Sequence, residues 1–192
     1  MKKVATDKKR TGLAKTWLVV VLGFSAAAFL VRWADLTIPA IGTAKIDPRE
    51  IFVTLGAAFT GPVGGLVIGF LSGLPALFVV SGFTSIIAHS LSGLLIGFLY
   101  KPVYQRWRMP VLLLGWIVLI VVYYYIFLIP TFLAAISLIQ SGGLSDVLGV
   151  DLSFFQAYSL LALVAFPEVT ATLLVTAIIL FALPEKYRRP LW

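Results

Sequence analysis

Two long segments of this chain contain no charged residue. One runs from Ile51 to Tyr100 and the other from Met109 to Ser145. Soluble domains are normally about 25% charged, whereas charged residues make up only 12% of this chain. One membrane crossing takes about 20 residues, so each segment must fold back on itself or leave the bilayer. The sequence therefore predicts an all-α integral membrane protein.

Most of the positive charge lies in three short clusters. Twelve of the fifteen lysines and arginines fall within residues 2–15, 101–108 and 186–189, and each cluster flanks an apolar segment. Short cytoplasmic segments of membrane proteins are enriched in these residues. We therefore interpret the net charge of +7 as a signal of topology and of contact with membrane lipid, and we expect no nucleic-acid partner.

The clusters also predict the number of membrane crossings. If all three are cytoplasmic, the chain crosses an even number of times between successive clusters. The result is a single membrane domain with a basic N-terminus at 1–15, an outer loop at 34–47 and a tail at 184–192. Pro75 leaves two alternatives for residues 74–84, which either continue the third helix or lie at the outer surface. We expect both termini in the cytoplasm and six transmembrane helices, at about 16–33, 48–60, 62–80, 85–100, 110–129 and 154–183.

The segment from Asp47 to Gly73 combines three local signals. Asp47 suits the N-cap of a helix, Pro48 its first position and Glu50 its third, as in a capping box. Gly61-Pro62 then breaks the apolar run, which predicts a turn between two short helices. Glycines at every fourth position predict a helix-packing stripe that another backbone approaches closely: Gly61, Gly65, Gly69 and Gly73.

This segment resembles a known family. A polar helix start, a short apolar helix and the motif Gly-Pro-x-Gly-Gly-x-x-x-Gly-Phe-x-Ser-Gly at residues 61–73 are similar to the second and third helices of S components. These proteins are the substrate-binding membrane subunits of energy-coupling factor (ECF) vitamin transporters. In helix count and spacing the likeness extends loosely over residues 16–185. Membrane sensor modules of the LytS type and some small cell-shape membrane proteins carry a similar turn.

The resemblance implies a function and a set of partners. An S component in a prokaryotic cell membrane captures a small vitamin-like solute from outside with high affinity. Its uptake then requires a coupling membrane subunit and two ATPase subunits. The family's first helix contacts the coupling subunit through an Ala-x-x-x-Ala surface, for which Gly23 and Ala27 stand here. Gly23 departs from the family pattern but keeps the side chain small.

Polar side chains inside the expected membrane segments are the first candidates for ligand binding. Arg49 and Glu50 begin the second helix, where capping and interface anchoring are the alternative roles. His89 lies in the outer part of the fourth helix, where a hydrogen bond to a neighbouring helix is the alternative. Glu168 lies well inside the sixth helix, and a buried carboxylate costs several kcal/mol unless it is protonated or paired.

Aromatic side chains of the expected fifth helix are the second set. Trp116 and Tyr123 share one face of it, with Tyr124 adjacent. Such residues form either an interfacial belt or a wall that stacks against a planar ligand. Together with the outer-half site that the resemblance implies, these observations predict six substrate-binding residues: Arg49, His89, Trp116, Tyr123, Tyr124 and Glu168.

The sequence also indicates what not to expect. It has no P-loop motif, no His-Glu-x-x-His or Gly-x-Ser-x-Gly motif, one histidine and no cysteine. We therefore expect no enzyme activity, no metal and no cofactor. Three alternatives to coupled uptake stay open. A sensor module would lead into a signalling domain, a scaffold would need no closed polar pocket, and a stand-alone secondary carrier would use Glu168 for proton coupling.

Overall fold

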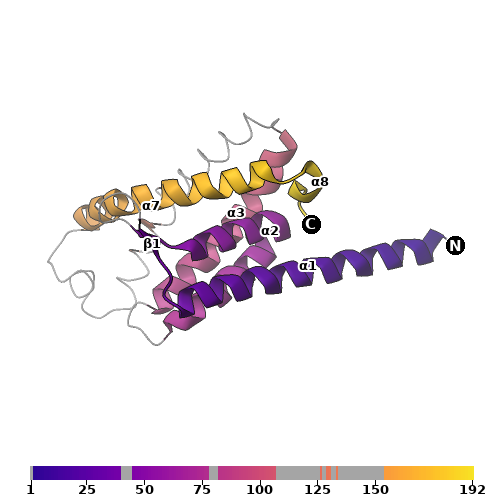
Figure 1. The fold of residues 1–192 in the computed structure, drawn as a ribbon, viewed down its shortest axis with the longest axis horizontal. Helices are drawn as coiled ribbons and strands as arrows, with labels where there is room; N and C mark the ends of the chain where they lie inside the picture. The colour runs from indigo at the N-terminus through magenta and orange to yellow at the C-terminus, as the bar shows by residue number, and fades with distance from the viewer. Residues whose placement is uncertain are drawn as a thin grey trace.

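Helices account for almost all of the described chain. The computed structural model describes residues 2–39, 45–77, 82–106 and 154–192, together with Ile126, Ile129, Pro130 and Leu133. Two-residue strands β1 (Ile38–Pro39) and β2 (Lys45–Ile46) pair antiparallel in the segment expected to be an outer loop. The helices are α1 (Lys2–Trp33), α2 (Pro48–Gly73), the 3-10 turn η1 (Leu74–Ala76), α3 (Gly82–Arg106), α7 (Phe154–Ala182) and α8 (Glu185–Arg188) (Figure 1).

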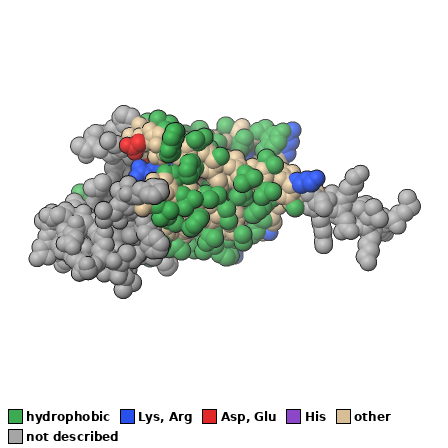
Figure 2. Space-filling model, turned by 90° about the horizontal axis from the view of Figure 1, so that it is seen from below, with side chains coloured by type: hydrophobic (Ala, Val, Ile, Leu, Met, Phe, Trp, Pro, Cys, Tyr) green, Lys and Arg blue, Asp and Glu red, His purple; other side chains and the backbone are tan. Residues whose placement is uncertain are grey.

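Three of these helices have the length and apolar composition needed to cross a membrane: Gly12–Trp33, Pro48–Ala76 and Ser85–Arg106. Outward-facing side chains are strongly apolar, for example Val19 at 68% exposed and Ile178 at 65%. Figure 2 shows hydrophobic side chains over the middle of the surface and charged ones towards its two ends. The all-helical fold class expected from the sequence is confirmed, and the expected helix at 110–129 lies outside the described residues.

α2 reverses direction at Gly61. This residue has φ 79° and ψ −171°, a backbone conformation that glycine adopts readily and side-chain-bearing residues avoid. As a result the two halves of α2 lie side by side. The Ile68 side chain occupies the place where a Cβ on Gly56 would stand, although residues 12 apart in a straight helix are about 18 Å apart along its axis. The turn expected at Gly61-Pro62 is therefore present.

The reversal changes how α2 relates to a bilayer. By length and composition Pro48–Ala76 qualifies as one span, but it is divided into residues 48–60 and 62–73. Each half is about 20 Å long, which is shorter than the hydrocarbon core of roughly 30 Å. The helix expected at 62–80 ends instead at Gly73, where η1 follows. In the described part of residues 74–84, the α-helix does not continue past Gly73: Leu74–Ala76 form the 3-10 turn, and α3 begins at Gly82.

Three other helix boundaries also differ from expectation. The first helix begins at Lys2 rather than at residue 16, so the basic N-terminal segment is itself helical. The helix expected at 85–100 spans Gly82–Arg106, and it accommodates Pro102 near its end. The last long helix ends at Ala182, within one residue of the expected boundary.

Both termini lie at the same end of the molecule (Figure 1). Three hydrogen bonds fix this arrangement. The indole Nε1 of Trp17 donates to the carbonyl of Thr60 at 2.7 Å. The amide of Leu191 donates to the carbonyl of Phe59 at 2.9 Å, and Lys101 Nζ donates to the carbonyl of Trp192 at 3.0 Å. We call this the basic end, because it holds the α2 turn, Lys101–Arg106 and Lys186–Arg189. The far end holds β1, β2 and the first residues of α2 and α3.

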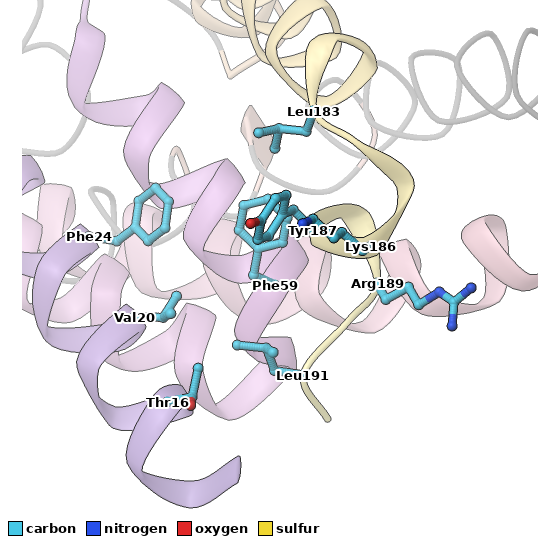
Figure 3. A pocket seen from close by; sticks show the side chains of 9 residues that line it. All are labelled: Thr16, Val20, Phe24, Phe59, Leu183, Lys186, Tyr187, Arg189 and Leu191. Carbon is cyan, nitrogen blue, oxygen red and sulfur yellow. The ribbon is translucent and has the colours of Figure 1, made fainter. Parts of the chain in front are cut away.

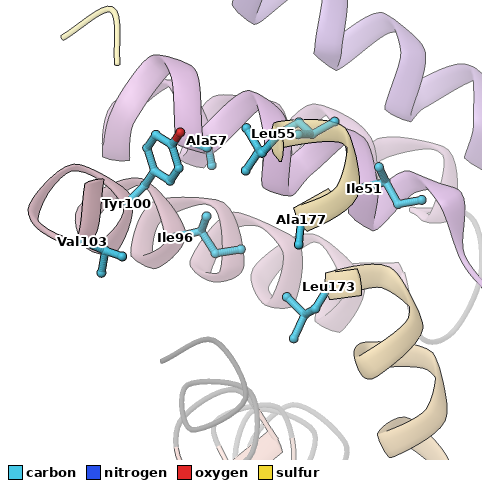
Figure 4. Close-up of a cluster of buried hydrophobic side chains, with 10 residues drawn as sticks. Ile51, Leu55, Ala57, Ile96, Tyr100, Val103, Leu173 and Ala177 are labelled. Atoms are coloured by element: carbon cyan, nitrogen blue, oxygen red, sulfur yellow. The ribbon is translucent and has the colours of Figure 1, made fainter. Parts of the chain in front are cut away.

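α2 is the central element and packs against α1, α3 and α7. Figure 4 shows the larger apolar cluster, in which α2, α3 and α7 meet. A smaller cluster joins α1 to α2 through Val21, Ala28, Val53 and Ile68. The buried members of the larger cluster are Ile51, Leu55, Ala57, Ala58, Ile96, Tyr100, Val103, Leu173, Ala177 and Leu180.

The glycine stripe of α2 lies where α3 comes closest. A methyl group on Gly65 would overlap the backbone carbonyl of Gly93, and one on Gly69 would overlap that of His89. These contacts are backbone to backbone, so no side-chain rotation relieves them. We call the contact the glycine seam. It comprises Gly61, Gly65, Gly69 and Gly73 of α2 with Gly93 and Gly97 of α3.

Candidate ligand-binding site

The candidate site starts at the first turn of α2, at the far end. Asp47 has extended backbone geometry, with φ −87° and ψ 105°, and acts as the N-cap of the helix. Its Oδ1 accepts a hydrogen bond from the backbone amide of Arg49 at 3.0 Å. Pro48 at the first helical position has no amide hydrogen to leave unsatisfied. The N-cap at Asp47 and the first position at Pro48 are therefore as the sequence predicts, and this start places Arg49 and Glu50 on the first turn.

Arg49 is held by residues from two elements. Its Nη2 forms an ion pair with Oδ2 of Asp47 at 2.7 Å, and its Nη1 lies 3.4 Å from the hydroxyl of Ser85 on α3. The side chain is only 8% exposed. Among the described residues, its Nε has no hydrogen-bond partner. A guanidinium is a planar fork of donors, so Arg49 keeps one donor for a further acceptor.

Glu50 pairs across the helix interface with His89. Oε1 of Glu50 contacts Nδ1 of His89, and the two side chains are 11% and 13% exposed. His89 follows Ser85 by four residues, so both lie on one face of α3. The glycine seam places that face, because the missing side chain of Gly69 lets the carbonyl of His89 approach α2. The glycine seam therefore determines where the polar side chains of α3 lie relative to α2.

Burial gives this cluster its energetic significance. Arg49 and Glu50 are 6% and 8% exposed, whereas most ionisable residues of folded proteins stay in water. Removing one partner of a buried pair leaves the other uncompensated, which typically costs about 3–5 kcal/mol. In the cluster, Asp47 balances the charge of Arg49, and the carboxylate of Glu50 contacts the imidazole of His89.

The structure brings together some of the expected ligand-binding residues. Arg49 and His89 belong to one cluster. Arg49 contacts Ser85, which lies on the same face of α3 as His89. Glu50, which is next to Arg49 in the chain, contacts His89. Glu168 lies near the middle of α7, and its side chain is outside the described set. The expected aromatic residues also lie outside the described residues: Trp116, Tyr123 and Tyr124.

Sequence reasoning missed one member of the cluster and treated two others too narrowly. Asp47 was interpreted only as a helix cap, although its carboxylate also carries the ion pair to Arg49. Glu50 was considered as a candidate contact, with capping and interface anchoring as the alternative, but its pairing with His89 was not foreseen. Ser85 was not singled out, but its position four residues before the sole histidine of an uncharged segment was a usable signal.

A second candidate site lies on the outer face of α1. Gly23 is exposed, and a Cβ built on it would meet no atom within 4 Å. Together with Ala27 it lines a shallow hollow of about 290 Å3. Because the described part of the chain leaves this small-residue face open, it can accept another surface. The remaining lining residues are Val20, Phe24 and Phe52.

Comparison with known proteins adds no further constraint on function. No protein-family profile matches the chain, and neither a curated protein nor a solved structure matches it.

Proposed function

We propose that this protein captures a small vitamin-like solute from outside the cell and takes it up together with an ATP-driven coupling module, as S components do. The polar cluster at the far end, in which Arg49 and Glu50 are buried, is the observation that carries the proposal. Five polar residues from the α2 start and α3 converge there, and four of them are ionisable. Intramembrane ionisable groups are costly and usually mark a ligand or ion pathway.

The cluster favours one kind of ligand. Arg49 is already paired with Asp47 at 2.7 Å, and the carboxylate of Glu50 is engaged by His89. A strongly anionic solute would therefore have to compete with Asp47 for the guanidinium. A neutral solute with hydrogen-bond acceptors can instead use the remaining Nε donor of Arg49. Trp116, Tyr123, Tyr124 and Glu168 complete the proposed site, as stacking residues and a deep contact.

The proposed orientation follows from the charges. Lys101–Arg106 and Lys186–Arg189 lie at the basic end, where Lys101 bonds to Trp192, and α1 enters from the same end. Basic segments face the cytoplasm, so the polar cluster faces outward. Reporters fused within 103–107 and after residue 192 should report the cytoplasm, and reporters at 40–44 the outside. An external signal at 103–107 would contradict this orientation and the six-helix topology that depends on it.

The partner proposal rests on the α1 hollow. Gly23 and Ala27 line it, and a small-residue surface lets another helix approach closely. We assign this face to the coupling membrane subunit, which two ATPases would drive from the cytoplasm. The solute site and the docking face then lie on different elements, so each can be altered alone.

The test of ligand capture is native mass spectrometry of the gently purified protein. We expect a small molecule to be retained by the wild type and to be lost in Arg49→Gln. Arg32→Gln is the matched control, because Arg32 pairs with Asp35 on the surface at 3.1 Å. Ser85→Ala removes only the 3.4 Å contact to Arg49 and should weaken retention without unfolding the protein. Equal retention by the wild type, Arg49→Gln and Ser85→Ala would contradict the assignment.

A second candidate function is favoured by the Glu50–His89 pair. A carboxylate in contact with an imidazole, both largely shielded from solvent, is also what a proton-coupled stand-alone carrier would use. Uptake into liposomes that contain only this protein separates the two. Under coupled uptake, a proton or sodium gradient gives binding without accumulation. Gradient-driven accumulation that Glu50→Gln or Glu168→Gln abolishes would establish the carrier instead.

A further inference from the structure

A cleft of about 330 Å3 lies at the basic end, between α1, the turn of α2 and the segment that follows α7 (Figure 3). It is separate from the polar cluster, which lies at the far end. It also differs from the α1 hollow, although the two share Val20 and Phe24. The residues that line the cleft are Thr16, Val20, Phe24, Phe59, Leu183, Lys186, Tyr187, Arg189 and Leu191.

One wall of the cleft is a continuous strip of α1. Thr16, Val20 and Phe24 are spaced four apart, so they share a helix face and extend along its axis for about 12 Å. Figure 3 shows Phe59 of α2 and Leu183 across from this strip. The strip starts beside the basic N-terminal part of α1 and leads towards the middle of the bundle. An extended hydrocarbon chain fits such a wall.

The rim of the cleft is cationic. Lys186 lies with its Nζ 4.7 Å from the ring centroid of Tyr187. Arg189 extends outward from the rim and is 70% exposed, and among the described residues it has a single ion-pair contact, at 3.5 Å, with the similarly exposed Glu185. Glu185 is the sole acidic residue of the segment 183–192, which also contains Lys186 and two arginines. The rim therefore attracts an anion, and long exposed side chains can turn towards it.

We propose that this cleft binds an anionic phospholipid. The phosphate group pairs with Lys186 and Arg189, and one acyl chain lies along Thr16, Val20 and Phe24. The cationic rim matches a phosphate group, and the apolar strip of α1 matches an acyl chain. A soluble anion would satisfy the rim but would leave the apolar strip exposed to water. Basic pockets at the cytoplasmic ends of membrane helices suit anionic headgroups. Neighbouring side chains of α1, such as Leu18 and Val19 at 51% and 68% exposed, face outward, so a lipid can enter from the bilayer.

The test compares lipid retention in native mass spectrometry, with dioleoyl phosphatidylglycerol and dioleoyl phosphatidylcholine as probes. The cleft variant is Lys186→Gln with Arg189→Gln. The control is Arg32→Gln with Arg106→Gln, which removes two positive charges elsewhere. A surface Lys or Arg contributes about fivefold in lipid affinity, so the cleft variant should bind phosphatidylglycerol about 25-fold more weakly. Phosphatidylcholine binding should not change in either variant.

Two further arms separate a lipid site from a simple anion site. Dihexanoyl phosphatidylglycerol keeps the headgroup but lacks the long chains, so it should bind more weakly than the dioleoyl lipid. Inorganic phosphate alone should give no thermal stabilisation. Equal losses in the cleft and control variants would overturn the proposal in favour of diffuse charge attraction. Full stabilisation by phosphate, or equal binding of the short-chain lipid, would overturn it in favour of a small-anion site.

Discussion

Small residues recur four apart at two places in this protein, and the two places are used differently. In the glycine seam, Gly65 and Gly69 are buried, and α3 backbone carbonyls fill the space that side chains would take. On α1, Gly23 is exposed, and no atom lies within 4 Å of a Cβ built there. The same sequence pattern thus gives a closed helix contact in one region and an open face in the other.

The spacing of small residues shows where another helix could approach the backbone. Whether a helix does approach there depends on the rest of the fold. α2 carries its stripe after a reversal at Gly61 that delivers it to α3. α1 contacts α2 through the opposite side, with Val21 and Ala28 buried, so its small-residue face is left over. Each prediction below changes one side of this comparison.

The largest effect is expected for Gly65→Leu. Its side chain would have to displace the backbone of Gly93, which cannot rotate away, so the cost should exceed the 1–3 kcal/mol typical of overpacking. Thermal unfolding in detergent measures it. Gly23→Leu makes the same chemical change where there is open space and should leave the melting temperature unchanged. If both variants melted like the wild type, the seam would not be a tight contact.

Gly61→Ala should have the next largest effect. At φ 79° and ψ −171°, a backbone region that is essentially restricted to glycine, an alanine costs about 1–3 kcal/mol, and its methyl group would also press on the Trp192 ring. The expected result is a lower melting temperature with the fold retained. Gly12→Ala is the control, because Gly12 lies within α1 and a Cβ built on it would meet no atom within 4 Å. Equal melting temperatures for the two variants would show that the reversal at Gly61 needs no glycine.

Much of the fold could be predicted because its signals are local. A cap at Asp47, a break at Gly61-Pro62 and the uncharged segments each act within a few residues, and the structure contains the corresponding helix start, reversal and apolar helices. Helix ends were predicted less well. Lys2–Lys15 extends α1, because basic residues have high helix propensity, although the charge pattern alone indicated a separate segment.

The polar cluster was harder to predict, because it depends on contacts between distant residues. Arg49 and His89 could be singled out as rare polar groups in apolar helices. That Glu50 reaches His89 and Ser85 reaches Arg49 follows from how the seam sets α3 against α2. Contacts between residues on different helices are hard to predict from the sequence, since no local rule fixes the register between two helices.

A moderate effect is expected for Trp17→Phe, which tests how α1 is held with its open face outward. The reversal at Gly61 leaves the Thr60 carbonyl without a regular helical partner, and the Trp17 indole donates to it at 2.7 Å. Loss of this bond should cost about 1–2 kcal/mol. Thermal unfolding measures the cost, and Leu18→Phe, on the exposed side of α1, should show none. A wild-type melting temperature for Trp17→Phe would mean that apolar packing alone holds α1.

The smallest effect on stability is expected at the open face, where the functional consequence should be large. Gly23→Trp and Ala27→Trp would fill the hollow of about 290 Å3 without displacing a core residue. Their stability should stay within about 0.5 kcal/mol of the wild type, as for other surface substitutions. Solute retention should also be unchanged, because the polar cluster lies on α2 and α3. Association with the proposed coupling subunit should be lost, since a bulky ring would keep the two helices apart.

Co-purification with the coupling subunit, run beside native mass spectrometry, measures both properties on the same sample. Leu22→Trp is the matched control, because it adds a ring to an exposed position next to Gly23, at a residue that does not line the hollow. It should preserve association. If Gly23→Trp instead removed the retained solute, α1 would belong to the ligand site. If Gly23→Trp and Leu22→Trp both still associated with the coupling subunit, the open face of α1 would serve only lipid contact. The glycine seam and the open face would then differ in packing but not in function.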